Sequence, residues 1–368
     1  MRVKSQLLAA LLLVTSGAAS AADAVPAATK KLNAYFDALQ AQGTVSGSIA
    51  ISERGVLRYQ RSIGFATVEN GIPQPADTGT RYRIGPVTKL FTAVLTMQLA
   101  EQASITLDNK LAEFYPDLPN AIAMTYRNLL QQRSGLAHYT DAPDFDTWRN
   151  TARTHAEMLD VITAGGARFA PGERVEKNDT NYLLLGYVLE KIYERSYDDI
   201  VRRQITSKLG LVRTYYAGTG GSSTLESISY QATPDGWRAE VDRDPSIDGG
   251  AGGMVSNATD LVTFMDAVFT GKLVTPYSLE SMRDQSGGSG IGLWPRTLAG
   301  NSALGESGNI GSFNACVYHF PDKKISIAWT SNASRVPMDE ILEEALRLIF
   351  EKGRKPPKVP PPKIKPGE

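Results

Sequence analysis

The sequence predicts an α+β protein in which one β-sheet is assembled from both ends of the chain. Two β-hairpin patterns support this, one at residues 46–61 and one at residues 312–331. The segment between them, most clearly from Tyr126 to Tyr197, is dominated by helical patterns broken by loops. Distant hairpins with helices inserted between them are typical of layered α+β folds. The expected lobes are a sheet lobe at about 22–100 and 260–352 and a mostly helical lobe at about 101–259.

Each further element follows from a local pattern. An amphipathic helix opens the domain and another closes it, because apolar residues recur at helical spacing in both. The glycine-rich stretch 249–256 predicts a turn that leads into a helix. The other expected elements are a helix at 27–42, a strand within 62–69, helices from 86, at 181–191 and at 258–269, and a helix at 337–351.

The stretch from Tyr82 to Glu101 predicts the helix around which the chain is organised. Pro86 suits the first helical position, because its missing N–H would have no partner there. Lys89 lies three residues later, on the same face at the helix N-terminus. A buried helix start offers free N–H groups and the positive end of the helix dipole, which suits a site for chemistry. Its apolar residues fall on one predicted stripe, formed by Val87, Leu90, Phe91, Val94, Leu95 and Leu99.

Charge and composition argue against several classes of function. The 368 residues carry 39 basic and 39 acidic side chains, so the net charge of zero offers no electrostatic footprint for nucleic acid. The single cysteine, Cys316, permits no internal disulfide. The three histidines, His138, His155 and His319, show no zinc-ligand spacing and are expected to be packing or surface residues. We therefore expect no metal and no cofactor.

The two ends of the chain are expected to lie outside the folded domain. Residues 1–21 combine a basic start, a short apolar core at 7–14 and a small-residue cleavage site, which is typical of a signal peptide. That core is too short to span a bilayer stably. We expect cleavage after about Ala21, a periplasmic or secreted product, and no membrane span in the mature protein. Residues 353–368 are rich in Pro and Lys and predict an extended or disordered tail after a domain at 22–352.

The segment Ile84-Gly-Pro-Val-Thr-Lys-Leu-Phe-Thr-Ala93 resembles the Ser-x-x-Lys element of serine β-lactamases, penicillin-binding proteins and related class C-type esterases. The resemblance covers about 27–351 and implies an antiparallel sheet flanked by helices, an inserted helical lobe, and a site in the cleft between them. It implies a serine nucleophile at the position of Pro86, which has no hydroxyl, and a general base at Lys89. Further segments resemble the family in the same order, namely Ile105–Pro119, Leu129–Leu136 and Phe169–Arg174.

Two further family motifs carry substituted residues. In the Tyr-x-Asn motif, Lys177 stands where the family has Tyr and Asp179 where it has Asn. In the His-x-Gly or Lys-x-Gly motif, Glu306 takes the first position and is followed by Ser307. With Lys89, the resemblance implies a site of two cations and two acids, whose buried charges must compensate one another.

Glycoside hydrolases use two carboxyl groups that face each other across a cleft. We favour Glu306 as the general acid and Asp179 as the base on water or the nucleophile. Lys89 and Lys177 can hold one carboxylate ionised while burial raises the pKa of the other. The expected substrate is an envelope or periplasmic glycan, or another small molecule. Supporting residues are Ser307, Asp141 with the rival acids Asp144 and Asp146 in its loop, and Trp148 and Trp294 as sugar-stacking platforms.

Two other functions stay open. The four charges could form a neutral salt-bridge cluster in a pseudoenzyme that binds a ligand without turnover. Alternatively, a relocated serine nucleophile could act in an esterase or peptidase, with Ser134, Ser256 and Ser307 as candidates. None of these serines stands three residues before a lysine, which argues against this mechanism.

Overall fold

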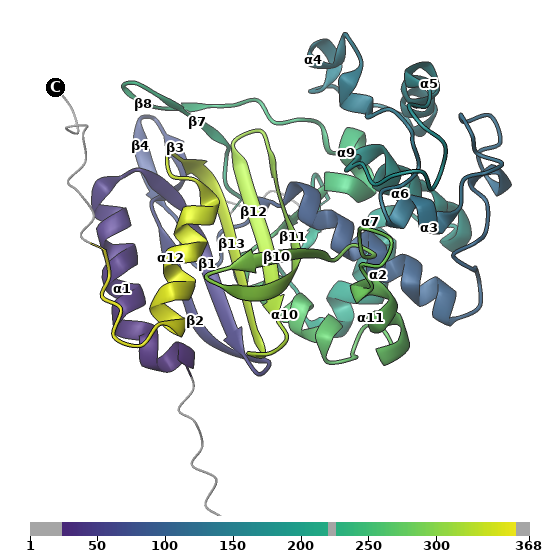
Figure 1. Ribbon diagram of the computed structural model, residues 1–368. Helices are drawn as coiled ribbons and strands as arrows, with labels where there is room; N and C mark the ends of the chain where they lie inside the picture. Colours follow the sequence, from purple (N-terminus) through teal and green to yellow (C-terminus); the bar gives the residue numbers. More distant parts are fainter. Residues whose placement is uncertain (1–23, 220–225, 358–368) are drawn as a thin grey trace, which may run out of the picture.

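The computed structural model describes residues 24–219 and 226–357 (Figure 1). Its main layer is a sheet of β1 (Val45–Glu53), β2 (Val56–Ile63), β10 (Trp294–Leu298), β11 (Asn301–Ile310), β12 (Phe313–Phe320) and β13 (Ile325–Ser334). The strand order is β10-β11-β12-β13-β1-β2, and all neighbours are antiparallel. Strand β1 pairs with β13, from Val45 opposite Ser334 to Glu53 opposite Ile325. The prediction of one sheet built from both chain ends is therefore confirmed.

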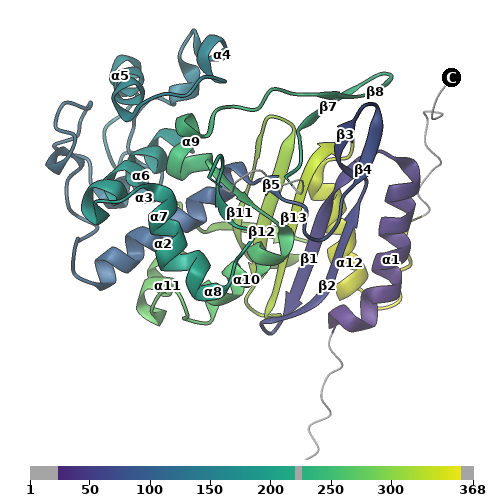
Figure 2. The same ribbon diagram turned by 180° about the vertical axis from the view of Figure 1, so that it is seen from behind.

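Helices cover both faces of this sheet. The opening helix α1 (Ala24–Gln42) and the closing helix α12 (Met338–Phe350) lie together on one face, where Phe36 stacks on Trp329 with ring centroids 6.1 Å apart. Helix α10 (Ala258–Phe269) packs on the other face. Figure 2 shows the same layers from behind, with the helical lobe on the side of the sheet away from α1 and α12. Successive strand residues point to opposite faces, so the sheet contributes to two separate cores.

The rest of the described chain forms the helical lobe and three small sheets. The remaining α-helices are α2 (Thr88–Glu101), α3 (Tyr126–Leu130), α4 (Phe145–Trp148), α5 (His155–Gly165), α6 (Asp179–Tyr193), α7 (Tyr197–Val201), α8 (Ser207–Leu209), α9 (Pro245–Gly252) and α11 (Pro276–Arg283). The small sheets pair β3 (Phe65–Glu69) with β4 (Ile72–Pro75), β7 (Tyr230–Thr233) with β8 (Gly236–Ala239), and β5 (Tyr82–Arg83) and β6 (Tyr215–Tyr216) with β9 (Met254–Ser256).

Two local predictions differ from the structure. Helix α2 is buried on all sides rather than along one stripe, because it packs against α6 and α9 as well as β11. The glycine-rich stretch 249–256 is not a simple turn. It forms the end of α9, with a kink at Gly249 (φ 43°), and then the short strand β9. Glycine is needed at the kink because this backbone conformation is strained for other residues.

The predicted signal peptide at 1–21 lies outside the described residues, as does most of the predicted tail at 353–368. The described tail residues follow the end of α12. In the part of the chain that the structure describes, no helix combines the length and the apolar content needed to cross a membrane. Export to the periplasm or medium stays a prediction.

Candidate functional site

The helix start at Pro86 lies directly against the sheet. Residues Gly85–Val87 form a 3-10 turn that leads into α2. The ring of Pro86 packs on Gly308 of β11 so closely that a Cβ at Gly308 would lie 2.3 Å from Cγ of Pro86. Gly85 adopts φ 47°, and a Cβ there would lie 3.2 Å from Cγ2 of Ile310. Both glycines therefore allow the backbone of the helix start to approach β11.

Position 86 cannot take part in acyl transfer. A serine mechanism needs a hydroxyl for attack and hydrogen-bond donors for the developing oxyanion. Pro86 supplies neither a hydroxyl nor a backbone N–H. In the structure, Pro86 lies in the 3-10 turn and Lys89 in the first turn of α2.

Asp179 begins helix α6 and is held between two basic groups. Its Oδ1 lies 2.5 Å from Nζ of Lys89, and its Oδ2 lies 3.3 Å from Nε2 of His138. Burial alone would raise the pKa of this carboxyl, but Lys89 and His138 outweigh burial and hold the pKa well below its usual range. The same ion pair, with Glu306 nearby, raises the pKa of Lys89 although Lys89 is only 5% exposed. Asp179 is therefore an ionised carboxylate.

Glu306 projects from β11 into a drier environment. It is 3% exposed, and its Oε1 accepts the backbone N–H of Ser307 at 2.9 Å. Nζ of Lys177 lies 3.5 Å from the same oxygen and 4.2 Å from the centre of the Trp294 ring. Burial raises the pKa of Glu306, and Lys89 and Lys177 offset only part of that effect. The pKa of Glu306 is thus shifted in the direction opposite to that of Asp179.

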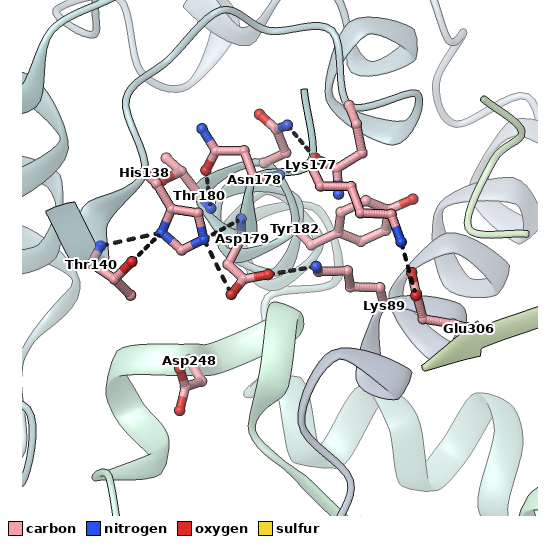
Figure 3. A network of polar contacts seen from close by, with 12 residues as sticks. Lys89, His138, Thr140, Lys177, Asn178, Asp179, Thr180, Tyr182, Asp248 and Glu306 are labelled. Atoms are coloured by element: carbon pink, nitrogen blue, oxygen red, sulfur yellow. Dashed lines mark hydrogen bonds and ion pairs between the residues drawn. The ribbon is translucent and has the colours of Figure 1, made fainter. Parts of the chain in front are cut away.

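Figure 3 shows these groups in one network, with the side chain of Lys89 lying between Asp179 and Glu306. Four side chains that are far apart in sequence come together here, from α2, from the loop before α6, from α6 itself and from β11. The structure brings together four of the predicted residues, Lys89, Lys177, Asp179 and Glu306, with Trp294 beside Lys177. The site holds one carboxyl group whose pKa is lowered, Asp179, and one whose pKa is raised, Glu306.

The sequence did not single out His138, which the structure places at the site. Nε2 of its ring faces Asp179, and Nδ1 lies 2.8 Å from Oγ1 of Thr140. The adjacent Tyr139 donates its hydroxyl to the buried Asp248 at 2.9 Å, and Arg243 lies 2.7 Å from the same Asp248 oxygen. This buried network anchors the loop that carries His138. The sequence signal that could have found it is the position of His138 two residues after the family-like Leu129–Leu136 segment.

Three of the predicted supporting residues lie elsewhere or act differently. Asp141 is exposed and pairs with Arg168 beside a cavity of about 580 Å³. Trp148 is only 6% exposed and packs edge-on against Phe145, so its ring offers no open face for a sugar. Ser307 follows Glu306 on a strand, so its side chain points to the opposite face of the sheet. Its contribution to the site is the backbone N–H that binds Glu306.

The other serine candidates are bonded away from the site. Oγ of Ser134 accepts the backbone N–H of Leu136 at 3.1 Å. Ser256 is buried, with its Oγ 2.8 Å from Oγ1 of Thr214. Across residues 24–219 and 226–357, no group of three or more His, Cys, Asp or Glu side chains is arranged to hold a metal ion.

Comparisons with known proteins agree with this architecture. The Beta-lactamase family model matches residues 32–351. PbpX of Bacillus subtilis (strain 168) is 23% identical over 250 residues, which are 67% of this chain and 61% of PbpX. Teichoic acid D-alanine hydrolase of Staphylococcus aureus is 25% identical over 187 residues, which are 51% of this chain and 44% of that protein. The chain therefore spans about half of the length of these relatives.

Solved structures show the same fold. D-amino acid amidase from Ochrobactrum anthropi SV3, complexed with D-phenylalanine, superposes with a TM-score of 0.77 at 22% identity, over 88% of this chain and 99% of the amidase. A penicillin-binding protein from Bacillus halodurans superposes with a TM-score of 0.76 at 20% identity, over 87% of this chain and 99% of that protein. At this level of identity, the likeness establishes the fold and not the reaction.

Proposed function

This chain belongs to the β-lactamase family, and we propose that it is a hydrolase that cleaves a glycosidic bond with Glu306 and Asp179. The observation that carries the proposal is the unequal environment of the two groups. Glu306 is buried and its pKa is raised, whereas the pKa of Asp179 is lowered between Lys89 and His138. A pair of carboxyl groups with separated pKa values is what acid–base cleavage of a glycoside requires.

The proposed reaction gives each group one role. Glu306 donates its proton to the glycosidic oxygen as the bond from that oxygen to the anomeric carbon breaks. Asp179 either accepts a proton from the water that attacks the anomeric carbon, or attacks that carbon itself and is later released by water. The ammonium group of Lys89 keeps Asp179 ionised until this step. In the first version, Asp179 then releases the proton it took from water to the solvent, and Glu306 regains a proton from the solvent. In the second, Glu306 takes its proton from the water that releases Asp179.

A glycoside suits this site better than the substrates named for the relatives. The relatives are described as a D-amino acid amidase and a teichoic acid D-alanine hydrolase. In this chain, the position that resembles the family nucleophile holds Pro86, and the lysine that would act as a base is paired with Asp179. Attack on a carbonyl group has no serine nucleophile at position 86, whereas protonation of a glycosidic oxygen needs only the acid that Glu306 supplies.

Trp294 and Lys177 give the proposed substrate a place to bind. Lys177 is half exposed and lies on the ring of the partly buried Trp294. A sugar ring could take the place of the lysine on this aromatic face, which would bring its glycosidic oxygen beside Glu306. Because the sequence predicts export, the proposed substrate is a glycan of the cell envelope or periplasm.

The test is release of product from a panel of envelope glycans and oligosaccharides. Wild type is compared with Glu306→Gln, Asp179→Asn and the exposed control Glu173→Gln, after each variant is shown to be folded by circular dichroism. We expect release by wild type and the control and a loss of two or more orders of magnitude in the two site variants. Equal release by wild type and Glu306→Gln would refute the assignment of the acid.

A second candidate function is ligand binding without turnover. It is favoured by the pairing of the charges, because Lys89 binds Asp179 and Lys177 binds Glu306, which leaves the cluster electrically balanced. A binding protein would show a ligand-dependent rise in melting temperature with no product from any glycan in the panel. Product release would exclude this alternative.

A further inference from the structure

A second cavity, of about 490 Å³, lies at the end of the main sheet where β12 turns into β13. Its walls come from the β1–β2 turn, the end of α10, α11 and the β12–β13 turn. None of the residues that line it belongs to the Glu306 and Asp179 site. The cavity combines a buried histidine with three basic side chains. Each feature indicates a chemical group that a ligand would carry there.

His319 forms the floor of this cavity and is held in one orientation. It is 8% exposed, and its ring stacks on Phe269 with centroids 4.0 Å apart. Nδ1 lies 2.8 Å from Oγ of Ser326, and that hydroxyl donates to Oδ1 of Asp266 at 2.5 Å. The only hydroxyl proton of Ser326 is used by Asp266, so the contact with His319 requires a proton on Nδ1. In the neutral ring, Nε2 therefore carries the lone pair.

No hydrogen bond reaches Nε2 of His319 from the described residues, and the ring lines the cavity. Burial, and then the charge of Arg283, lower the pKa of His319 to about 4, so the ring is neutral at pH 7. An accepting nitrogen that faces a cavity can be bound by water or by a ligand that donates a hydrogen bond. A group that donates a hydrogen bond, such as a hydroxyl, would satisfy it.

The basic side chains reach the same cavity from three elements. Arg54 comes from the β1–β2 turn, Arg283 from the end of α11, and Lys324 from the β12–β13 turn. The ion-pair partner of Arg283 is the exposed Glu280, at 3.8 Å. Asp266 is the acid that lines the cavity, and it already accepts the hydroxyl of Ser326. The charge around the cavity is positive, which favours an anion.

We propose that this cavity binds a hydroxylated organic anion of the size of a sugar phosphate or sugar acid. The anionic group binds Arg283 and Lys324, with Arg54 at the same rim. A hydroxyl group of the ligand donates to Nε2 of His319, and the carbon skeleton rests against Phe269. The volume suits a ligand with a ring and one charged group rather than a bare inorganic ion.

Isothermal titration calorimetry tests the proposal with glucose 6-phosphate and glucuronate, and with glucose and inorganic phosphate as fragments. Lys324→Gln is compared with Lys323→Gln, a matched control in the same turn whose ammonium group lies 5.8 Å from the ring of Phe350 and not in the cavity. Arg283→Gln removes a second surface charge without touching the core. We expect glucose 6-phosphate or glucuronate to bind wild type and Lys323→Gln equally, and Lys324→Gln and Arg283→Gln about fivefold more weakly.

The fragments and one further variant separate the outcomes. Each fragment alone should bind more weakly than the ligand that carries both groups. Inorganic phosphate binding as tightly as glucose 6-phosphate would overturn the hydroxyl contact with His319. Equal weakening of binding in Lys323→Gln and Lys324→Gln would mean diffuse electrostatic attraction and would overturn the site. Absence of binding by both anions would also overturn it. Binding that disappears in Glu306→Gln would place the ligand in the other cleft and also overturn it.

Discussion

Glu306 and Asp179 join the same network from different elements, β11 and α6, and their surroundings shift their pKa values in opposite directions. Asp179 starts a helix and makes direct contacts with Lys89 and His138. Glu306 is a buried residue in the middle of strand β11, and Lys177 stands at the surface 3.5 Å from its carboxyl group. Burial disfavours charge on both carboxyl groups, but only Asp179 has a buried cation close enough to reverse that effect.

The difference teaches that the placement of the cations decides the roles of the acids. Lys89 is 5% exposed, so its field at Asp179 is weakly screened, whereas the side chain of Lys177 is 55% exposed and its field is screened by water. If the two acid–lysine pairs were equivalent, both acids would be ionised alike and the four charges would cancel. Because they are not, the pKa of Glu306 is raised and that of Asp179 is lowered.

The largest expected effect is on turnover. Glu306→Gln keeps the shape of the side chain but removes the proton that the proposed mechanism transfers. We expect the rate constant for glycan cleavage to fall by a factor of about 10² to 10⁴, which is the usual contribution of a general acid. Steady-state assays of reducing-end release measure it. An active Glu306→Gln variant would direct attention to Asp179 and to Asp141 on its cavity.

The next effect is on stability and separates the two acids directly. Asp179→Ala leaves the buried ammonium group of Lys89 without its ion-pair partner, so we expect a loss of about 3–5 kcal/mol in the free energy of unfolding. Glu306→Gln replaces a costly buried acid by a neutral group, so we expect no loss of stability at pH 7, or a gain. Urea denaturation at pH 7 gives both values. Equal losses would show that the two pairs are equivalent after all.

The pH dependence of stability should have opposite signs for the two groups. The folded pKa of Asp179 is lowered, so its contribution is present above the unfolded value of about 3.9 and is lost as pH falls below it. The folded pKa of Glu306 is raised, so its contribution is present below the unfolded value of about 4.3 and is lost as pH rises from there toward the folded pKa.

Unfolding of wild type, Asp179→Asn and Glu306→Gln across pH 3 to 8 checks these signs. The stability difference between wild type and Asp179→Asn should grow as pH rises toward about 4, and that between wild type and Glu306→Gln should shrink above it. Each slope is limited to about 1.4 kcal/mol per pH unit for one proton. Slopes of the same sign for both variants would remove the basis for separate acid and base roles.

The fold was predictable because its main features are encoded in local periodicity. The hairpins at both chain ends and the helix at 258–269 appear in the structure at nearly the predicted bounds. The burial of α2 on all sides was not predictable, because it depends on α6 and α9, which arrive from far along the chain. Local apolar spacing does not report how many neighbours a helix acquires.

Within the site, residue types were easier to predict than contacts. The motif positions identified Lys89, Lys177, Asp179 and Glu306, but the sequence could not say which lysine pairs with which acid. His138 was missed because a lone histidine carries no spacing signal. Trp148 was misplaced because aromatic residues in a loop look the same whether they face a cleft or pack inward, as it does on Phe145.

The smallest expected effect concerns Lys177, whose ammonium group lies between Glu306 and the face of Trp294. Lys177→Ala removes one of the two charges that lower the pKa of Glu306, so that pKa should rise further and the alkaline limb of the rate profile should move to higher pH. The variant also uncovers the ring of Trp294, so we expect KM for an oligosaccharide to fall by a few-fold while kcat changes little. Measuring kcat and KM between pH 5 and 9 separates these effects. Loss of kcat by orders of magnitude would instead mean that Lys177 acts directly on the substrate. The contrast between Lys89, which is buried and shifts the pKa of Asp179, and Lys177, which lies at the surface, would then fail.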